Sequence, residues 1–495
     1  MYRLAVTVAL VGAVILSWWL FSGDYTTGTV ANGFFFLVRG DTVEVYSLTD
    51  NGDDPELFTT FPTDYSDLSY CDGSMRTPFS GFISRSPTKT VVLISDRGVV
   101  PISFGNYIMS LDADEAGFCA SVSVVDEGTY VYDRDGDLLL QLQGDTFSAL
   151  NMARRRVATV DYWEGLLRFY DDSGNLVWSR QVSNPSMVFL SHYAVVVQRK
   201  QGDSFPVDVY DYYGNLVASY DNSVYDFQYP KFSAYNRWAL IPLSETEFAL
   251  LDGTSEVARW EVPASIGPYS IGQVSASELD TRGGVYHLTE AGFLLYARDG
   301  EIVRMLDIKK PYRQQMEVSF TGTTHYVSIP PNYSYGTRKS VVLVWEGELM
   351  LLPPELLEPA DGERVVSPVT LRWSRPPDAT EFTVHVSDSE DFADPIEFTT
   401  ADTELTVELD VGTWYWRVRA EGGYWSEVRS FSVVLPPPEL TDIGEVMQGE
   451  NIEFSWSAVE NAEGYELVVE DNAGTVVLLS LIHISEPTRP RLSSY

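Results

Sequence analysis

The chain is poor in basic residues, and lysine is especially scarce among them. Its 495 residues include 33 Lys and Arg against 71 Asp and Glu, which gives a formal net charge of −38, and only 6 of the basic residues are Lys. Proteins that wrap DNA or RNA neutralise phosphates with a basic surface. The charge therefore argues against nucleic-acid binding, and we expect no nucleic-acid partner.

Cysteine is nearly absent, with Cys71 and Cys119 as the two copies. In an exported chain a disulfide between them is permitted, and two buried unpaired thiols are the alternative. The two positions fall at different phases of neighbouring repeats, which favours the unpaired alternative. The pair remains a possible disulfide.

Motifs that carry catalysis or bind metals are missing as well. The sequence has no H-E-x-x-H or H-x-H pairing, no G-x-S-x-G elbow, no P-loop and no G-x-G-x-x-G after a strand. Acidic clusters at residues 50–56, 112–115 and 133–137 do not have EF-hand calcium spacing, so we interpret them as solvated turns. We therefore name no catalytic, cofactor-binding or metal-binding residue and expect no cofactor.

The N-terminal segment has no charged residue over positions 4–21, "LAVTVALVGAVILSWWLF". As a helix it would be roughly 27 Å long, about the thickness of a bilayer core. The residues at the end of this segment offer no good signal-peptide cleavage site. Trp18 and Trp19 are typical of a membrane–water interface. Arg3 precedes the segment, and no basic residue follows it before Arg39. This predicts a signal anchor over residues 1–22, with a cytoplasmic N-terminus and a periplasmic or extracellular bulk; a cleaved signal peptide is the alternative.

One short phrase recurs along the chain at spacings near forty residues. It occurs as "VYDRDGDLLL" from Val131, "FYDDSGNLVW" from Phe169, "VYDYYGNLVA" from Val209 and "LYARDGEIVR" from Leu295. Each copy joins two alternating apolar runs through an Asp and a Gly, which is typical of a β-hairpin. The clear turn glycines are Gly136, Gly174, Gly214 and Gly300, and weaker members are Gly52, Gly98, Gly253 and Gly347.

These repeats give about eight units, each the size of a four-stranded propeller blade. We expect an all-β chain with a seven- or eight-bladed β-propeller over residues 28–352. The phrase, with Trp178 after the Asp–Gly turn, resembles quinoprotein-like propeller repeats of the PQQ/WD40 type, a group that includes outer-membrane assembly scaffolds. The resemblance implies an architecture, not a function.

After residue 352 a proline-rich segment begins, and the sequence pattern changes. The stretches "VTLRWS", with Trp373, and "GTWYWRVRAEGGYWSEVRSFSV", with Trp416, alternate with period two. They resemble the fibronectin type III family, especially its bacterial envelope members. The resemblance implies a β-sandwich over residues 353–435 in which Trp373 is the buried tryptophan.

A second unit of this kind begins after another proline run and does not finish. "IEFSWSAVENAEGYELVVED" places Trp456 where the first unit has Trp373, so we expect a truncated module over residues 436–478. Residues 479–489, "LSLIHISEPTR", match the in-frame translation of a transposase-type sequencing adapter. We expect residues 479–495 to be adapter-derived and the natural protein to continue beyond residue 478.

Together these features predict a membrane-anchored, extracytoplasmic recognition or scaffold protein. Its propeller would bind an envelope protein or a glycan without catalysis. The alternative is a carbohydrate-active propeller hydrolase with fibronectin-like accessory modules. That alternative needs carboxylates that converge on one mouth of the ring, and a sequence does not give their separation.

Overall fold

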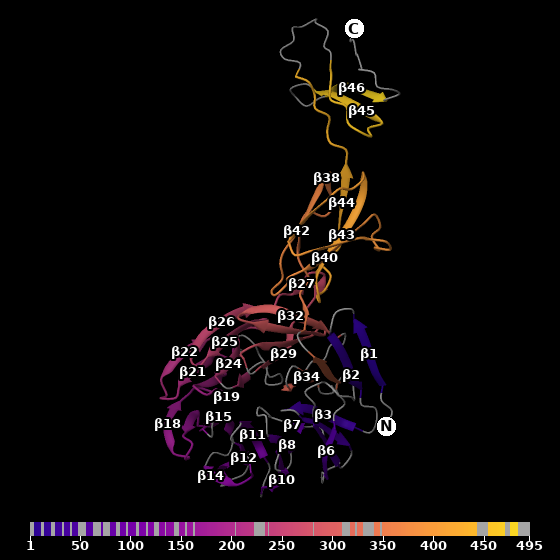
Figure 1. Cartoon of the computed structure of the whole chain (residues 1–495). Coiled ribbons are helices and arrows are strands. Elements are labelled where there is room, and N and C mark those ends of the chain that lie inside the picture. The colour runs from indigo at the N-terminus through magenta and orange to yellow at the C-terminus, as the bar shows by residue number, and fades with distance from the viewer. Residues whose placement is uncertain are drawn as a thin grey trace. The chain divides into compact units, whose positions relative to one another are not determined.

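The computed structural model describes residues 4–483, except 11–13, 21–24, 32–33, 40–41, 48–55, 63–70, 73–79, 86–89, 96–97, 105–107, 115–116, 123–127, 134, 143–147, 154–155, 162–163, 203, 222–232, 236, 281, 309–316, 322–323, 330–340, 347–348, 443–453 and 471–475. The chain divides into two compact units, Met1–Leu352 and Pro353–Tyr495. Every regular element in the described residues is a strand (Figure 1). The prediction of an all-β chain is confirmed.

The described part of the first unit contains eight sheets of four or five strands. The first four are β3 (Tyr25–Ala31), β4 (Phe34–Arg39), β5 (Thr42–Ser47) and β6 (Glu56–Pro62); β7 (Cys71–Asp72), β8 (Ser80–Arg85), β9 (Thr90–Ser95) and β10 (Gly98–Ser103); β11 (Ile108–Asp114), β12 (Gly117–Val122), β13 (Gly128–Asp133) and β14 (Leu138–Leu142); β15 (Ser148–Ala153), β16 (Arg156–Asp161), β17 (Leu166–Tyr170) and β18 (Leu176–Gln181).

The other four sheets continue along the chain. They are β19 (Pro185–Leu190), β20 (Ala194–Arg199), β21 (Val207–Asp211) and β22 (Leu216–Tyr220); β23 (Ser233–Tyr235), β24 (Trp238–Pro242), β25 (Glu247–Asp252) and β26 (Ser255–Glu261); β29 (Val274–Leu279), β30 (Val285–Thr289), β31 (Phe293–Arg298) and β32 (Glu301–Asp307) with β36 (Met350–Leu351); β33 (Glu317–Thr321), β34 (Thr324–Ile329) and β35 (Val341–Glu346) with β2 (Val14–Leu20) and β1 (Leu4–Leu10). A small pair, β27 (Ser265–Ile266) and β28 (Tyr269–Ser270), forms a sheet of its own.

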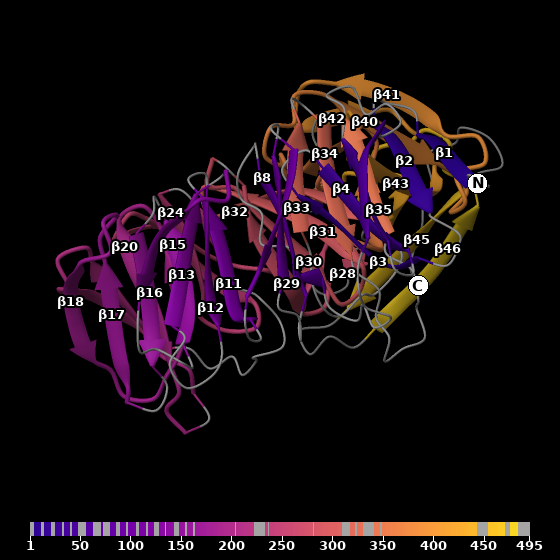
Figure 2. The ribbon, with the colours of Figure 1, turned by 90° about the horizontal axis from the view of Figure 1, so that it is seen from below.

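The sheets are antiparallel and follow one another in chain order, as Figure 1 shows by colour. The first strands of successive sheets are in contact: β11 with β15, β15 with β19, β19 with β23, and β23 with β29. Strand β3, from the N-terminal part, also contacts β33 and β34 of the last sheet. Within each four-stranded sheet the strands pair in chain order, so that the fourth strand lies farthest from the first, as Figure 2 shows for β16, β17 and β18. The unit is therefore propeller-like.

The N-terminal segment differs from the expected membrane helix. Residues 4–10 and 14–20 form the antiparallel strands β1 and β2, and β2 pairs with β35. Both strands are rich in Val, Ile, Thr or Trp, which favour β-structure, and an apolar run alone does not separate helix from strand. In the residues described here, no helix is long and apolar enough to cross a bilayer.

The second unit begins with a two-sheet sandwich. One sheet contains β37 (Leu356–Glu358), β39 (Val369–Trp373) and β42 (Glu404–Val407); the other contains β38 (Glu363–Val366), β44 (Arg429–Val434), β43 (Gly412–Ala420), β40 (Phe382–Ser387) and β41 (Ile396–Thr400). Trp373 and Trp416 are both buried, and the ring of Trp373 meets Phe382 of the opposite sheet edge-on at 5.7 Å. The core therefore lies between the two sheets.

A two-stranded sheet follows, made of β45 (Gly464–Glu470) and β46 (Val476–His483). Trp456 is half-buried, forms a bridge with Leu440 and packs edge-on against Tyr465 at 5.5 Å. Strand β46 includes residues 479–483 of the expected adapter-derived segment, and residues 484–495 lie outside the described part. The truncated module and the adapter origin stay predictions.

Candidate interaction surface

The repeated phrase folds into a turn that is organised by its aspartate. Oδ1 of Asp171 accepts hydrogen bonds from the backbone N–H groups of Ser173 (3.0 Å) and Asn175 (2.8 Å). The side-chain amide of Asn175 donates to Oδ2 at 3.1 Å. The backbone and side-chain bonds from Asn175 lower the pKa of Asp171 below its usual value. The carboxylate is thus held in its charged form, as an acceptor for the turn.

Asp133 and Asp211 form the same turn, since each accepts from the N–H groups two and four residues later. The predicted turn glycines have positive φ: 86° at Gly136, 81° at Gly174, 81° at Gly214 and 84° at Gly300. Gly300 belongs to a tighter turn of two residues, because Arg298 pairs directly with Glu301. The single phrase therefore covers two kinds of turn.

A turn glycine also packs against the sheet before it. A Cβ at Gly214 would lie 2.9 Å from the ring of Trp178 in β18, and one at Gly174 would lie 3.1 Å from Leu140 in β14. Both contacts are closer than side chains normally allow. The positive φ and the neighbouring sheet together favour glycine at both positions, most strongly at Gly214, where the close atoms belong to a buried indole ring.

Trp178 joins its sheet to the next one. Its indole stacks on Phe169 at 5.4 Å and donates from Nε1 to the backbone oxygen of Tyr212 at 3.0 Å. Trp260, which the sequence analysis did not single out, does the same: it stacks on Phe248 and donates to His287 of the following sheet at 3.1 Å. Trp178 and Trp260 both lie in the fourth strand of their sheet, but at different distances from the turn that precedes it. A fixed spacing from the turn therefore identifies Trp178 and misses Trp260.

Another Asp turn was missed because it lies in the first hairpin of its sheet. Oδ1 of Asp280 accepts from the N–H groups of Arg282 (2.7 Å) and Gly284 (2.8 Å), and Gly283 has φ of 88°. The hydroxyl of Tyr296 donates to Oδ2 of Asp280 at 2.7 Å. Burial, and then the nearby carboxylate, raise the pKa of Tyr296. This hydroxyl therefore stays protonated as a donor.

The fourth strand of six sheets contains a β-bulge at one equivalent position. In each case the pairing with the third strand shifts by one residue just after the turn. The extra residues are Phe58, Leu139, Val177, Val217, Val257 and Val303. A bulge inserts one unpaired residue and re-aims its side chain. All six of these residues are apolar.

Five of the six bulge residues, together with the leucines that precede four of them, have exposed apolar side chains at equivalent positions of five sheets. We call this set of side chains the outer-strand surface; its members are Leu57, Phe58, Leu138, Leu139, Leu176, Val177, Leu216, Val217 and Val257, each between 39% and 56% exposed. The exception is Val303, which is 3% exposed. Its strand, β32, is paired with the additional strand β36.

A Ser–His pair inside the unit does not form a catalytic base and nucleophile. His287 is buried, and its Nδ1 lies 2.8 Å from Oγ of Ser277. Because the indole of Trp260 can only donate, Nε2 of His287 must accept, so the proton of the neutral ring is on Nδ1. His287 then donates to Ser277 and cannot remove its proton. We interpret the group as a structural network between sheets.

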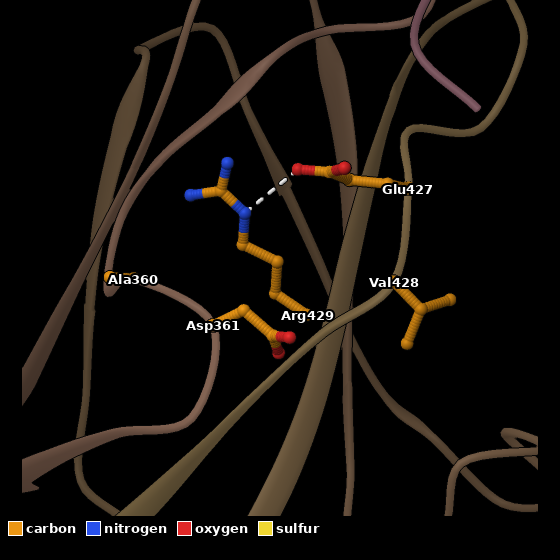
Figure 3. A pocket seen from close by; sticks show the side chains of 5 residues that line it. All are labelled: Ala360, Asp361, Glu427, Val428 and Arg429. Atoms are coloured by element: carbon orange, nitrogen blue, oxygen red, sulfur yellow. Dashed lines mark hydrogen bonds and ion pairs between the residues drawn. The ribbon is translucent and has the colours of Figure 1, made fainter.

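A pocket of about 290 Å³ lies in the sandwich of the second unit (Figure 3). It is lined by Ala360, Asp361, Glu427, Val428 and Arg429. Nε of Arg429 bonds Glu427 at 2.8 Å, and Asp361 accepts from the backbone N–H of residue 430 at 2.8 Å. Each charged side chain of this pocket therefore already has a hydrogen-bond partner, either within the pocket or at Ser430.

Other predicted positions are separate from the outer-strand surface. Cys71 lies in β7 and Cys119 in β12, and their side chains are outside the described part, so the disulfide stays a prediction. Within the described residues, no group of three His, Cys, Asp or Glu is arranged to hold a metal ion.

No protein-family model matches the chain, and no curated protein matches its sequence. Among solved structures it is similar to the computationally designed protein Ika8 (14% identity over 66% of this chain and 97% of that one, TM-score 0.42). It is also similar to BamB from Moraxella catarrhalis (10%, 69% and 100%, TM-score 0.39) and to apo AztD from Citrobacter koseri (12%, 66% and 96%, TM-score 0.41). BamB and AztD are β-propeller proteins. Because the TM-scores lie below 0.5, the description of this chain as propeller-like is based on its own sheets.

Proposed function

We propose that the protein is a non-catalytic scaffold that binds other proteins through the outer strands of an eight-bladed propeller. The observation that carries this proposal is the outer-strand surface. Exposed apolar side chains recur at the equivalent position of five sheets, whereas ordinary exposed apolar residues are scattered singly over a protein surface. A partner that covers this surface would gain a binding free energy of about 25 cal/mol for each Å² of apolar area that it buries.

The count of eight blades is supported by the eight sheets and by the contact of β3 with β33 and β34. Such a contact joins the first and last sheets of a closed ring. For the sandwich of the second unit we propose a fibronectin type III-like module that serves as a spacer or as a further docking surface. The strand order and the buried Trp373 support this assignment.

Capture from an envelope extract tests the proposal. The bait is the full chain, compared with a variant that carries Leu176→Ser, Val177→Ser, Leu216→Ser and Val217→Ser. The matched control carries Ile396→Ser, Val411→Ser and Val428→Ser, which alter exposed apolar residues of the second unit. We expect a protein that is retained by the wild type and the control and lost by the outer-strand variant. Equal retention by all three would contradict the proposal.

The same three baits, passed over immobilised glycan polymers, separate a protein partner from a glycan partner. Turnover of a polymer that is abolished by one carboxylate substitution would favour the hydrolase alternative instead. A location outside the cytoplasm and attachment through residues 4–21 stay predictions. Fractionation of cells that express the full chain, with and without residues 1–22, tests both.

A further inference from the structure

Strand β36 provides an internal example of what covers an outer strand. It pairs antiparallel with β32 directly after the bulge, with Arg304 opposite Leu351 and Met305 opposite Met350. Residues 303–306 of β32 are all buried. In β18, which has its bulge at the equivalent position, only Trp178 is buried. The added strand and the burial of the outer strand therefore occur together.

Strands β18 and β22 have the same local sequence and lack such a cover. Residues 174–177 and 214–217 both read Gly-Asn-Leu-Val. Each segment forms an Asp turn followed by the bulge, at Val177 and at Val217. Among the residues that the structure describes, no strand pairs with the outer edge of either one. Such an edge presents backbone N–H and C=O groups that an additional strand can bond.

The bulge does not prevent this pairing, since β36 pairs with the two residues that follow Val303. The equivalent residues are Trp178 and Ser179 in β18, and Ala218 and Ser219 in β22. Natural edge strands are often protected by lysine, and neither β18 nor β22 contains one. Strand β18 does contain the exposed Arg180, whose Nη1 donates to the backbone oxygen of Ser179 at 2.9 Å, so an added strand must displace this side-chain contact.

The turns that precede these two strands are acidic. Asp171 and the exposed Asp172 precede β18, and Asp211 precedes β22. The chain as a whole carries a net charge of −38. A partner segment that approaches the edge is therefore favoured if it has basic residues beside its apolar ones.

We propose, building on the proposed scaffold function, that β18 and β22 each bind an extended segment of a partner protein as a fifth strand. The segment is apolar where it contacts Val177 or Val217 and basic at its ends. Its backbone pairs at Trp178 and Ser179, or at Ala218 and Ser219. The recognition mode is strand addition, in which main-chain bonds provide affinity and side chains provide selectivity.

The test uses the full chain and a fluorescein-labelled peptide, Lys-Gly-Lys-Leu-Met-Leu-Leu-Pro-Lys. The peptide copies residues 347–353 with Glu348→Lys and adds a lysine at each end. Fluorescence anisotropy should show saturable binding below about 1 mM. Two further peptides carry N-methyl groups on alternate amides. One of these should bind at least about tenfold more weakly and the other like the parent, because alternate amides of an added strand face the edge.

Protein variants locate the site. Val177→Lys with Val217→Lys should weaken peptide binding at least about tenfold, since lysine disfavours edge pairing. Val411→Lys with Val428→Lys, at exposed positions of the second unit, should leave it unchanged. An unchanged far-ultraviolet spectrum and melting curve for both pairs excludes misfolding as the cause.

Three results would overturn strand addition at these edges. The first is no saturable binding below about 1 mM. The second is equal binding of both N-methylated peptides, which leaves the scaffold function intact if the outer-strand variant still loses its captured protein. The third is binding that the Val177 and Val217 variants do not change, as when the peptide displaces β36 from β32. Self-association of the chain that the same variants remove would identify a second copy as the occupant and overturn the partner assignment.

Discussion

The two units of the chain distribute their stabilising contacts differently. In the first unit, turn glycines pack against side chains of a neighbouring sheet at several boundaries, as Gly214 does against Trp178 and Gly174 against Leu140. In the second unit one core lies between two sheets and includes the fully buried Trp416. Damage to one boundary in a repeat affects its neighbours first, whereas damage to a single core affects the whole module. Substitutions in the two units should therefore differ in how far their effects extend.

The largest effect is expected from Trp416→Ala. Removing a fully buried indole costs about 3–5 kcal/mol, which should unfold the sandwich of the second unit and leave the first unit folded. Hydrogen exchange followed by mass spectrometry measures both units in one sample. Trp416→Phe is the control, because it keeps most of the apolar volume and should retain protection. Loss of protection in the first unit as well would show that the two units are energetically coupled.

Gly214→Ala should break one boundary of the first unit. The alanine has an unfavourable positive φ, and its Cβ overlaps the ring of Trp178, so we expect a cost of about 2–4 kcal/mol. Faster exchange should be confined to β15–β18 and β19–β22. Gly202→Ala is the matched control: its φ is also positive, at 63°, but a Cβ there meets nothing within 4 Å. Equal effects of the two changes would contradict the packing role of Gly214.

Asp211→Ala should have a smaller effect in the same region. It removes the acceptor for the N–H groups of Tyr213 and Asn215, at a cost of about 1–2 kcal/mol. Thermal melting of the first unit measures this change. Asp211→Asn keeps one acceptor oxygen and should recover most of the stability; a loss as large as that of alanine would show that the charge matters more than the hydrogen bonds.

The smallest effect is a pH dependence of the second unit through His385. Burial lowers the pKa of His385 below 6.5 in the folded state, and Arg417 and Arg419 act in the same direction, while the hydrogen bond to Glu397 opposes them. The unfolded chain therefore takes up the proton first. Stability should be fully present above pH 6.5 and decline as the pH falls from there through the folded-state pKa.

The aromatic groups that pack around His385 are Phe392 and Trp425. Melting temperatures of the second unit between about pH 5 and 8, compared with those of His385→Gln, isolate this contribution from that of the acidic residues. The wild type should lose stability relative to the variant as the pH falls. A constant difference between the two would show that His385 titrates alike in the folded and unfolded chains.

The sequence predicted hairpins well where one residue decides the local structure. An Asp with a Gly three residues later predicts the turns at Asp133, Asp171 and Asp211, because the carboxylate bonds and the positive φ are local. The bulges were not predicted, since a shift in pairing depends on the neighbouring strand. The bulges do have one sign in the sequence. Two adjacent apolar residues after the turn, as at Leu176 and Val177, interrupt the alternation of apolar and polar residues along the strand.

Other features depend on tertiary contacts that a sequence pattern does not contain. Residues 4–10 and 14–20 have a composition compatible with a membrane helix and with strands, and pairing of β2 with β35 decides between them in the structure. The buried Val303 belongs to β32, which pairs with β36 from more than forty residues further along the chain. The contact of Gly214 with Trp178 likewise joins two successive repeats.

Strand β36 has a mechanical consequence. It is the last strand before Pro353, where the second unit begins. Any tension along the chain from the second unit therefore reaches the first unit through the pairing of Leu351 with Arg304 and of Met350 with Met305. Release of this two-residue pairing would leave β32 with an unpaired outer edge, as in β18 and β22.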